Sequence, residues 1–341
     1  KMDVLSPKER LLRSLKGEAV DRAPVICPGG MMNSAIVDVM KNHGNVLPDG
    51  HRDSKIMADL ALDVQADTGF ENVGIPFCMT VEAEALGSDI DFGTLKCEPK
   101  IAKEIFPSVK DVIYKADDAL VKSPRAGTVF QAIYNAAGHS PDIPVIGSIT
   151  GPLSTAASVV DPMNFLKELR KVKDESHRFV DYVTNQLIGY ARYMVDNGAS
   201  VISIADPTAT GEILGPRMFG DYAVVYINKL VDAIHEMGVP VIVHICGRMQ
   251  AVTHHIANLH ADAISVDALV SLKKLKEAYP QLTTMGNLST FLLEFGEEPN
   301  IQRGTEQLIQ DEINILAPAC GLSTSTPLSN IQTFTGAAKA V

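Results

Sequence analysis

From about residue 143 to residue 320, short β-branched runs alternate with longer amphipathic stretches, and this alternation restricts the fold more than any other feature. The pattern is typical of a parallel sheet whose strands are joined by helices. Strands are predicted at 23–27, 71–77, 143–150, 199–206, 239–246, 262–267, 282–289 and 313–320. Eight strand–helix repeats predict an α/β fold of the (β/α)8 or TIM barrel type, which needs about 250 residues.

Two segments stand outside the repeats. The opening residues predict a helical lead-in, and residues 85–106 alternate and turn like a small inserted hairpin. Because no linker rich in Gly, Pro or Ser divides the chain, we expect residues 1–341 to form one domain. An open doubly wound sheet is the alternative, but Pro28-Gly29-Gly30 after the first strand is not the glycine-rich phosphate fingerprint of that fold.

Charge and cysteine content exclude several classes of partner and setting. Lys and Arg total 30 against 41 Asp and Glu, which gives a net charge of −11, and no basic cluster offsets it. Nucleic acid and anionic membranes are therefore not expected partners. The start lacks the apolar run of a secretory signal, and no apolar stretch approaches the roughly 18 residues of a membrane span. Five scattered cysteines argue against a disulfide framework and predict a cytoplasmic protein.

His244 and Cys246 lie two residues apart at the end of a predicted strand, so their side chains point to the same face. Barrel active sites form at that C-terminal end. Cys320 ends the last predicted strand, and each of the two cysteines is followed by glycine. One imidazole and two thiolates predict a catalytic zinc site with an open fourth position. A lone cysteine on a strand is more often a small core residue, so the hypothesis depends on the three residues together.

Three further polar residues end strands at the same level of the barrel: Asp206, Asp267 and Asn287. We expect them to contribute to catalysis at the mouth; capping of the following helices is the alternative role for the two aspartates. The apolar loop 27–35 is expected to form another part of the mouth. The remaining cysteines show no ligand spacing and are expected to be structural, and His254-His255 is expected to be a solvated or packed helical face.

The segment PVIVHICGRMQAVTHHIANLHADAISVD, followed by MGNLS and LAPACGLSTSTPLSNIQTF, resembles the uroporphyrinogen decarboxylase superfamily. The opening SPKERLLRSLKGEAVDRAPV resembles the start of the same superfamily, so the resemblance spans essentially the whole chain. The most similar branch is that of the corrinoid-dependent methyltransferases, such as the methylcobalamin:coenzyme M methyltransferases. The resemblance implies a (β/α)8 barrel with zinc on His244, Cys246 and Cys320. It also implies Asp267 as an acidic residue that can take the remaining zinc position.

The same resemblance implies transfer of a methyl group from a methyl-corrinoid, such as methylcobalamin, to a zinc-activated thiol. No cobalamin-binding domain is found in the chain, so we expect a separate corrinoid carrier protein to deliver the donor. The acceptor stays open among coenzyme M, homocysteine, another thiol and a folate.

Two alternatives are a tetrapyrrole decarboxylase and a non-catalytic partner of a corrinoid protein. The decarboxylase branch carries an arginine-rich loop and an aspartate after the first strand. Here APVICPGGMMNSAIVDVM contains no arginine and no acid before Asp38, which argues against decarboxylation.

Overall fold

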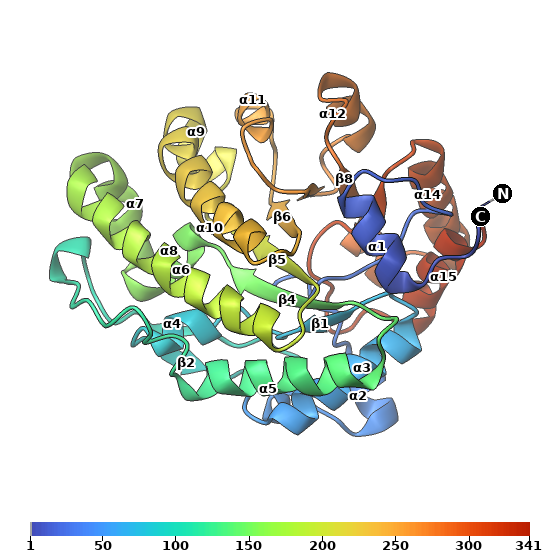
Figure 1. Ribbon diagram of the computed structural model, residues 1–341, viewed down its shortest axis with the longest axis horizontal. Helices are drawn as coiled ribbons and strands as arrows, with labels where there is room; N and C mark the ends of the chain where they lie inside the picture. Colours follow the sequence, from blue (N-terminus) through green and yellow to red (C-terminus); the bar gives the residue numbers. More distant parts are fainter. Residues whose placement is uncertain (1) are drawn as a thin grey trace.

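Parallel strands form one curled sheet in the computed structural model, which describes residues 2–341 (Figure 1). In their order across the sheet they are β1 (Val73–Ile75), β4 (Val145–Thr150), β5 (Val201–Ala205), β6 (Val241–Ile245), β7 (Ala263–Val266), β8 (Thr284–Leu288) and β9 (Ile315–Pro318). The strand interiors are almost entirely buried. Strands covered on both faces have continuous apolar runs, which explains why the sequence pattern predicts them.

The first predicted strand closes the sheet into a barrel. Val25 bridges to Leu316 of β9 in parallel, and the Ile26 amide donates to the Leu316 carbonyl at 2.9 Å. On its other side the Val25 carbonyl accepts from the Glu71 amide at 2.9 Å, directly before β1. The (β/α)8 barrel is confirmed, but the strand expected at 23–27 is reduced to a single bridge. Pro24 lacks an amide hydrogen and so cannot extend the ladder on both sides.

Helices surround the sheet on its outer face (Figure 1). The longer ones are α3 (Ser54–Thr68), α5 (Pro124–His139), α7 (Pro162–Lys171), α8 (Lys173–Asp196), α10 (Val225–Glu236), α14 (Glu298–Gln310) and α15 (Leu328–Lys339). The shorter ones are α2 (Val37–His43), α4 (Val81–Ala85), α6 (Pro152–Val159), α9 (Gly211–Met218), α11 (Thr253–Ile256), α12 (Leu272–Ala278) and α13 (Thr290–Phe295). Among them, α3, α5, α8, α10, α12 and α14 pack directly on strands, as the apolar periodicity of amphipathic helices predicts.

The helical lead-in is α1 (Pro7–Leu15), and it closes the N-terminal end of the barrel. Leu11 and Leu15 pack against inward-facing strand residues of the barrel floor, which include Ile146, Val201, Ile242 and Ile315. Because this end is filled with side chains, the C-terminal end remains for chemistry.

Buried ion pairs fasten the lead-in to the barrel. Arg10 contacts Asp21 at 2.8 Å and Glu71 at 2.6 Å, and Arg22 contacts Glu71 at 2.7 Å. The hydrogen bond from Arg10 holds the pKa of Asp21 well below its usual range. The network thus joins α1, the first strand and the start of β1.

The inserted hairpin is present as β2 (Asp89–Asp91) and β3 (Lys100–Lys103), which pair antiparallel. Its tip reaches the loop after β9, where the Thr324 hydroxyl donates to the Lys96 carbonyl at 2.8 Å. The hairpin therefore lies against the C-terminal mouth of the barrel. Across residues 2–341, no helix has the length and apolar character needed to cross a membrane.

Candidate metal centre at the barrel mouth

His244, Cys246 and Cys320 come together at the mouth. One ligand atom from each residue lies within 4.8 Å of the others. His244 is on β6, whereas Cys246 and Cys320 lie just beyond the ends of β6 and β9 rather than within those strands as predicted. The turn after Cys246 begins at once because Gly247 takes φ +72°, a left-handed conformation that favours glycine.

The His244 side chain is fully buried and oriented by a single hydrogen bond. Its Nδ1 lies 2.8 Å from the hydroxyl of Ser265, which is its register partner on β7. Its Nε2 is buried and has no hydrogen-bond partner. A buried ring nitrogen without a partner is costly, whereas a metal ligand held through its other nitrogen has this arrangement. The geometry of His244 thus fits a metal ligand.

The two thiols lie close enough to affect each other's ionisation. The hydrogen bond from Cys246 lowers the pKa of Cys320 to about 4, against the opposing effect of burial. The hydrogen bond to Cys320, followed by burial, raises the pKa of Cys246. One nitrogen and two sulfurs form a donor set that suits Zn²⁺ better than Mg²⁺ or Ca²⁺.

The loop 27–35 covers this centre with methionines. Met31 sulfur lies 3.9 Å from the Cys246 sulfur, and Met32 sulfur lies 3.8 Å from the Ser265 hydroxyl. Gly321 allows this approach, because a Cβ at that position would lie 2.3 Å from the Met31 carbonyl oxygen. The apolar cover limits access of water to the thiols.

Asp206 acts as a helix cap in the structure. Its buried carboxylate accepts from the backbone amides of Leu153 and Ser154 at 2.9 and 2.8 Å, and from the Ser154 hydroxyl at 2.6 Å. These groups lie at the start of α6. The carboxylate thus caps α6, which precedes Asp206 in the chain, and not the following helix α9, whose N-cap is Thr210.

Asp267 and Asn287 lie outside the three-residue group. The half-buried Asp267 carboxylate accepts from the Leu269 amide at 3.2 Å. The Asn287 amide donates to the carbonyls of Asp267 and Val270 at 2.9 and 2.7 Å. Asn287 thus holds the loop that carries Asp267.

The other sulfur and imidazole groups have ordinary roles. All five cysteines are free; Cys27 and Cys78 are buried and Cys97 is exposed. The Cys27 thiol donates to the Met32 carbonyl at 3.0 Å. His255 Nε2 lies 2.8 Å from the Pro216 carbonyl, and its ring packs at a tilt against that of His254, so this pair is a packed helical face.

Sequence reasoning missed two groups near the mouth. Ser265 could have been found from the register of neighbouring parallel strands, because it is level with His244. Glu82 of α4 is fully buried, and burial raises its pKa to about 7 while its carboxylate accepts from the Thr150 amide at 2.6 Å. No sequence signal marks Glu82, since a glutamate in a short helix is usually solvated.

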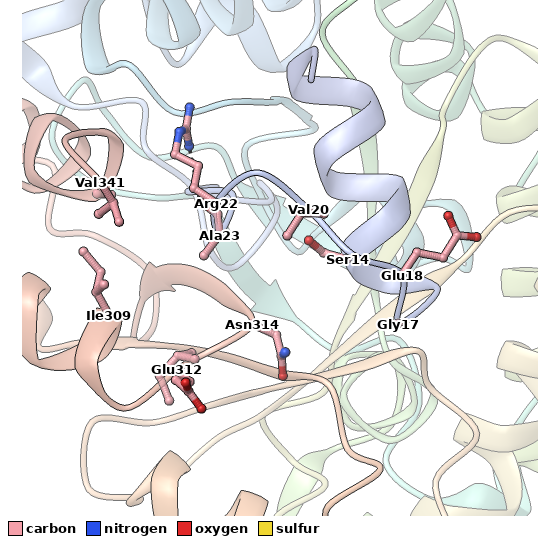
Figure 2. A pocket seen from close by; sticks show the side chains of 12 residues that line it. Ser14, Gly17, Glu18, Val20, Arg22, Ala23, Ile309, Glu312, Asn314 and Val341 are labelled. Carbon is pink, nitrogen blue, oxygen red and sulfur yellow. Dashed lines mark hydrogen bonds between the residues drawn. The ribbon is translucent and has the colours of Figure 1, made fainter. Parts of the chain in front are cut away.

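A separate pocket of about 500 Å³ lies at the opposite end of the barrel (Figure 2). Its walls come from α1, the segment before the first strand and the turn before β9, with Ser14, Arg22, Glu312 and Asn314 among the labelled side chains. None of the predicted site residues lines it. The pocket and the His-Cys-Cys group thus lie at opposite ends of the barrel.

The fold and the centre together define a (β/α)8 barrel protein with a His-Cys-Cys group at its C-terminal mouth. The chain belongs to the uroporphyrinogen decarboxylase (URO-D) family, whose model matches residues 6–341.

Similar proteins include the methylcobamide:CoM methyltransferase MtbA of Methanosarcina acetivorans, which is 31% identical over 99% of both chains. The methylcobamide:CoM methyltransferase MtaA of Methanosarcina barkeri is 30% identical over 98% of both. A solved methyltransferase from Methanosarcina mazei is 31% identical, covers 98% of both chains and superposes with a TM-score of 0.92. The predicted resemblance to the methyltransferase branch is confirmed.

Proposed function

We propose that this chain is a zinc-dependent methyltransferase that moves a methyl group from a methyl-corrinoid to a thiol. The observation that carries the proposal is the convergence of His244, Cys246 and Cys320 within 4.8 Å at the barrel mouth. The names and full-length similarity of the methylcobamide:CoM methyltransferases support the donor and the class of acceptor. Because residues 2–341 are occupied by the barrel, its lead-in and its hairpin, we expect a separate corrinoid carrier protein to present the donor.

His244 Nε2 and the two cysteine sulfurs would hold the zinc ion, and Asp267 would take the remaining position until a substrate replaces it. Bound zinc would keep a thiol ionised at neutral pH, as it does for water in other enzymes. Ser265 fixes the His244 ring so that Nε2 faces the thiols. Met31 excludes water from the space beside Cys246. Exclusion of water favours attack by the substrate sulfur over hydrolysis of reactive groups.

The transfer itself balances as a displacement between two substrates. The substrate thiol loses its proton to solvent, and its sulfur attacks the methyl carbon of the methyl-corrinoid. The carbon–cobalt bond breaks, its electron pair stays on cobalt, and a thioether and a reduced corrinoid result. The chain's residues align the sulfur; proximity of this kind accounts for a large share of rate acceleration.

The two alternatives have less support. The loop 27–35 presents methionines to the centre instead of arginines. Arg10 and Arg22 are committed to Glu71 at the opposite end of the barrel, so neither is free to bind the carboxylates of a tetrapyrrole. A non-catalytic partner protein would have no need for an intact donor set at the mouth.

We further propose a cytoplasmic setting. All five cysteines are unpaired, and thiolate ligands require a reducing environment.

Zinc analysis of the purified protein tests the proposal. Wild-type protein should contain about one zinc ion per chain, and Cys246→Ala and Cys320→Ala should lose both zinc and methyl transfer. Cys97→Ala is the matched control, because this cysteine is exposed on the hairpin. Wild-type protein without zinc, or full activity in both ligand variants, would overturn the proposal.

A further inference from the structure

The pocket of about 500 Å³ at the N-terminal end of the barrel has no part in the proposed function (Figure 2). Its walls come from α1, the residues that follow α1, the turn before β9 and the end of α15, so segments distant in sequence border one space. This volume is typical of a small-molecule site and far exceeds the roughly 30 Å³ of one water molecule. None of His244, Cys246 and Cys320 lines it.

The Ser14 hydroxyl lines this pocket and has no hydrogen-bond partner, although only 6% of the Ser14 surface is exposed. Buried hydroxyls on other helices of the chain donate to the carbonyl four residues earlier, as those of Thr68, Thr184 and Thr305 do. The Ser14 oxygen makes no such bond and points away from α1 into the pocket (Figure 2). Because buried hydroxyls are rarely left unpaired, this one is suited to a bound molecule.

Asn314 lines the pocket from the turn before β9, and three donors orient its amide. Its Oδ1 accepts from the Thr284 backbone amide and hydroxyl, both at 3.0 Å, and from Lys276 Nζ at 3.4 Å. These donors identify the oxygen end of the amide, so Asn314 has its N–H groups to offer to a ligand. Two N–H donors and a hydroxyl match a carbonyl oxygen, which can accept two hydrogen bonds.

The charges around the pocket disfavour an anion. Arg22 is the one cation among the residues that line it, and its two terminal nitrogens already donate to Glu71 at 2.7 and 3.0 Å. Glu18 and Glu312 add exposed carboxylates to the walls of a chain with a net charge of −11. Exposed carboxylates are hydrated, so they also bind a cation only weakly. Most of the other wall residues are apolar: Val20, Ala23, Ile309, Ile313 and Ala338.

We propose that this pocket binds a small neutral molecule that has an apolar body and a carbonyl group. The carbonyl oxygen would accept from the Ser14 hydroxyl and the Asn314 amide while the body packs against the apolar walls. The bound molecule would join α1 to the turn before β9, the strand that leads to Cys320. Because no metal-binding residue lines the pocket, its occupation does not depend on the proposed function.

Ligand-observed NMR titration of the full chain with three aromatic probes of similar size tests the proposal. Acetophenone is neutral and has a carbonyl group, ethylbenzene lacks the carbonyl, and benzoate has a negative charge. Acetophenone should bind at least about tenfold more tightly than ethylbenzene, because it gains two net hydrogen bonds, and benzoate should bind more weakly than acetophenone. Ser14→Ala should reduce the preference for acetophenone over ethylbenzene about fivefold, as the loss of one net hydrogen bond predicts. Val20→Phe, which fills part of the pocket, should weaken binding of both neutral probes.

Thr326→Val is the matched control, because the Thr326 hydroxyl is also buried without a partner but does not line the pocket. This variant should bind all three probes like wild type. Cys320→Ala should also bind acetophenone like wild type, which separates this proposal from the proposed function. In the absence of a probe, Ser14→Ala should unfold in urea with a free energy no lower than that of wild type, since it removes a hydroxyl that bonds to nothing.

Four results would overturn the proposal. They are no saturable binding of acetophenone, a preference for acetophenone that is unchanged in Ser14→Ala, tighter binding of benzoate than of acetophenone, and a loss of stability in Ser14→Ala without a probe. The last result would assign the Ser14 hydroxyl a structural role in place of a binding role.

Discussion

Ser265→Ala should weaken zinc binding without removing any ligand. The Ser265 hydroxyl lies 2.8 Å from His244 Nδ1, and both side chains are fully buried. With Nε2 committed to a metal, Nδ1 must carry a hydrogen, and the variant leaves that buried donor unpaired. Such a loss costs about 1–3 kcal/mol, and outer-sphere substitutions of this kind lower metal affinity about 10–100-fold.

The effect should fall on zinc affinity more than on folding. In the metal-free protein the His244 ring can exchange its tautomer, which reduces the cost of the missing hydroxyl. Competition with a chromophoric chelator under reducing conditions measures the affinity, and urea unfolding of the metal-free variant measures the stability. Ser203→Ala is the control, because Ser203 is also buried, on β5, while the His244 hydrogen bond goes to Ser265. Zinc affinity within about twofold of wild type would refute the reasoning.

Three further substitutions test the fold around the centre. The pKa of Glu82 is raised from 4.5 to about 7, so the folded state keeps a proton that the unfolded state loses; stability should fall by about 2–3 kcal/mol between pH 5 and 8. The free energy of unfolding of Glu82→Gln, measured in urea, should not show this fall. A pH dependence equal to that of wild type would contradict the expectation. Arg10→Met breaks the buried network and should lower the free energy of unfolding, measured in urea, by about 3 kcal/mol. A decrease below about 1 kcal/mol would contradict this role of Arg10. Asp206→Ala should cost about 2 kcal/mol in the same assay yet retain zinc; loss of zinc would contradict its capping role.

The barrel could be predicted from the sequence because its strands are buried on both faces. Seven of the eight predicted segments contain a strand, and the exception at 23–27 forms one bridge beside Pro24. His244 and Cys246 could be paired from alternation along a strand. Cys320 could be assigned to the same site only because its strand ends at the same height in the barrel. Alternation along one strand could not place it there, because β7 and β8 separate β6 from β9 in the sheet.

The parts of the site that could not be predicted depend on contacts distant in sequence. Ser265 orients His244 from the neighbouring strand, and Met31 reaches Cys246 from 215 positions away. The position of Asp206 at a strand end indicated that it lies at the barrel mouth. It did not reveal that the carboxylate accepts hydrogen bonds from backbone amides at the start of α6.

Methyl transfer from methylcobalamin to a thiol tests the central claim most directly. The zinc-loaded protein is incubated with methylcobalamin and 2-mercaptoethanesulfonate under anaerobic conditions, and the absorbance of the methyl–cobalt bond is followed while the methylated thioether is quantified. We predict loss of that absorbance with an equal yield of thioether for wild type, and neither for Cys320→Ala. No thioether from the zinc-loaded wild type, or an equal rate with Cys320→Ala, would contradict the account.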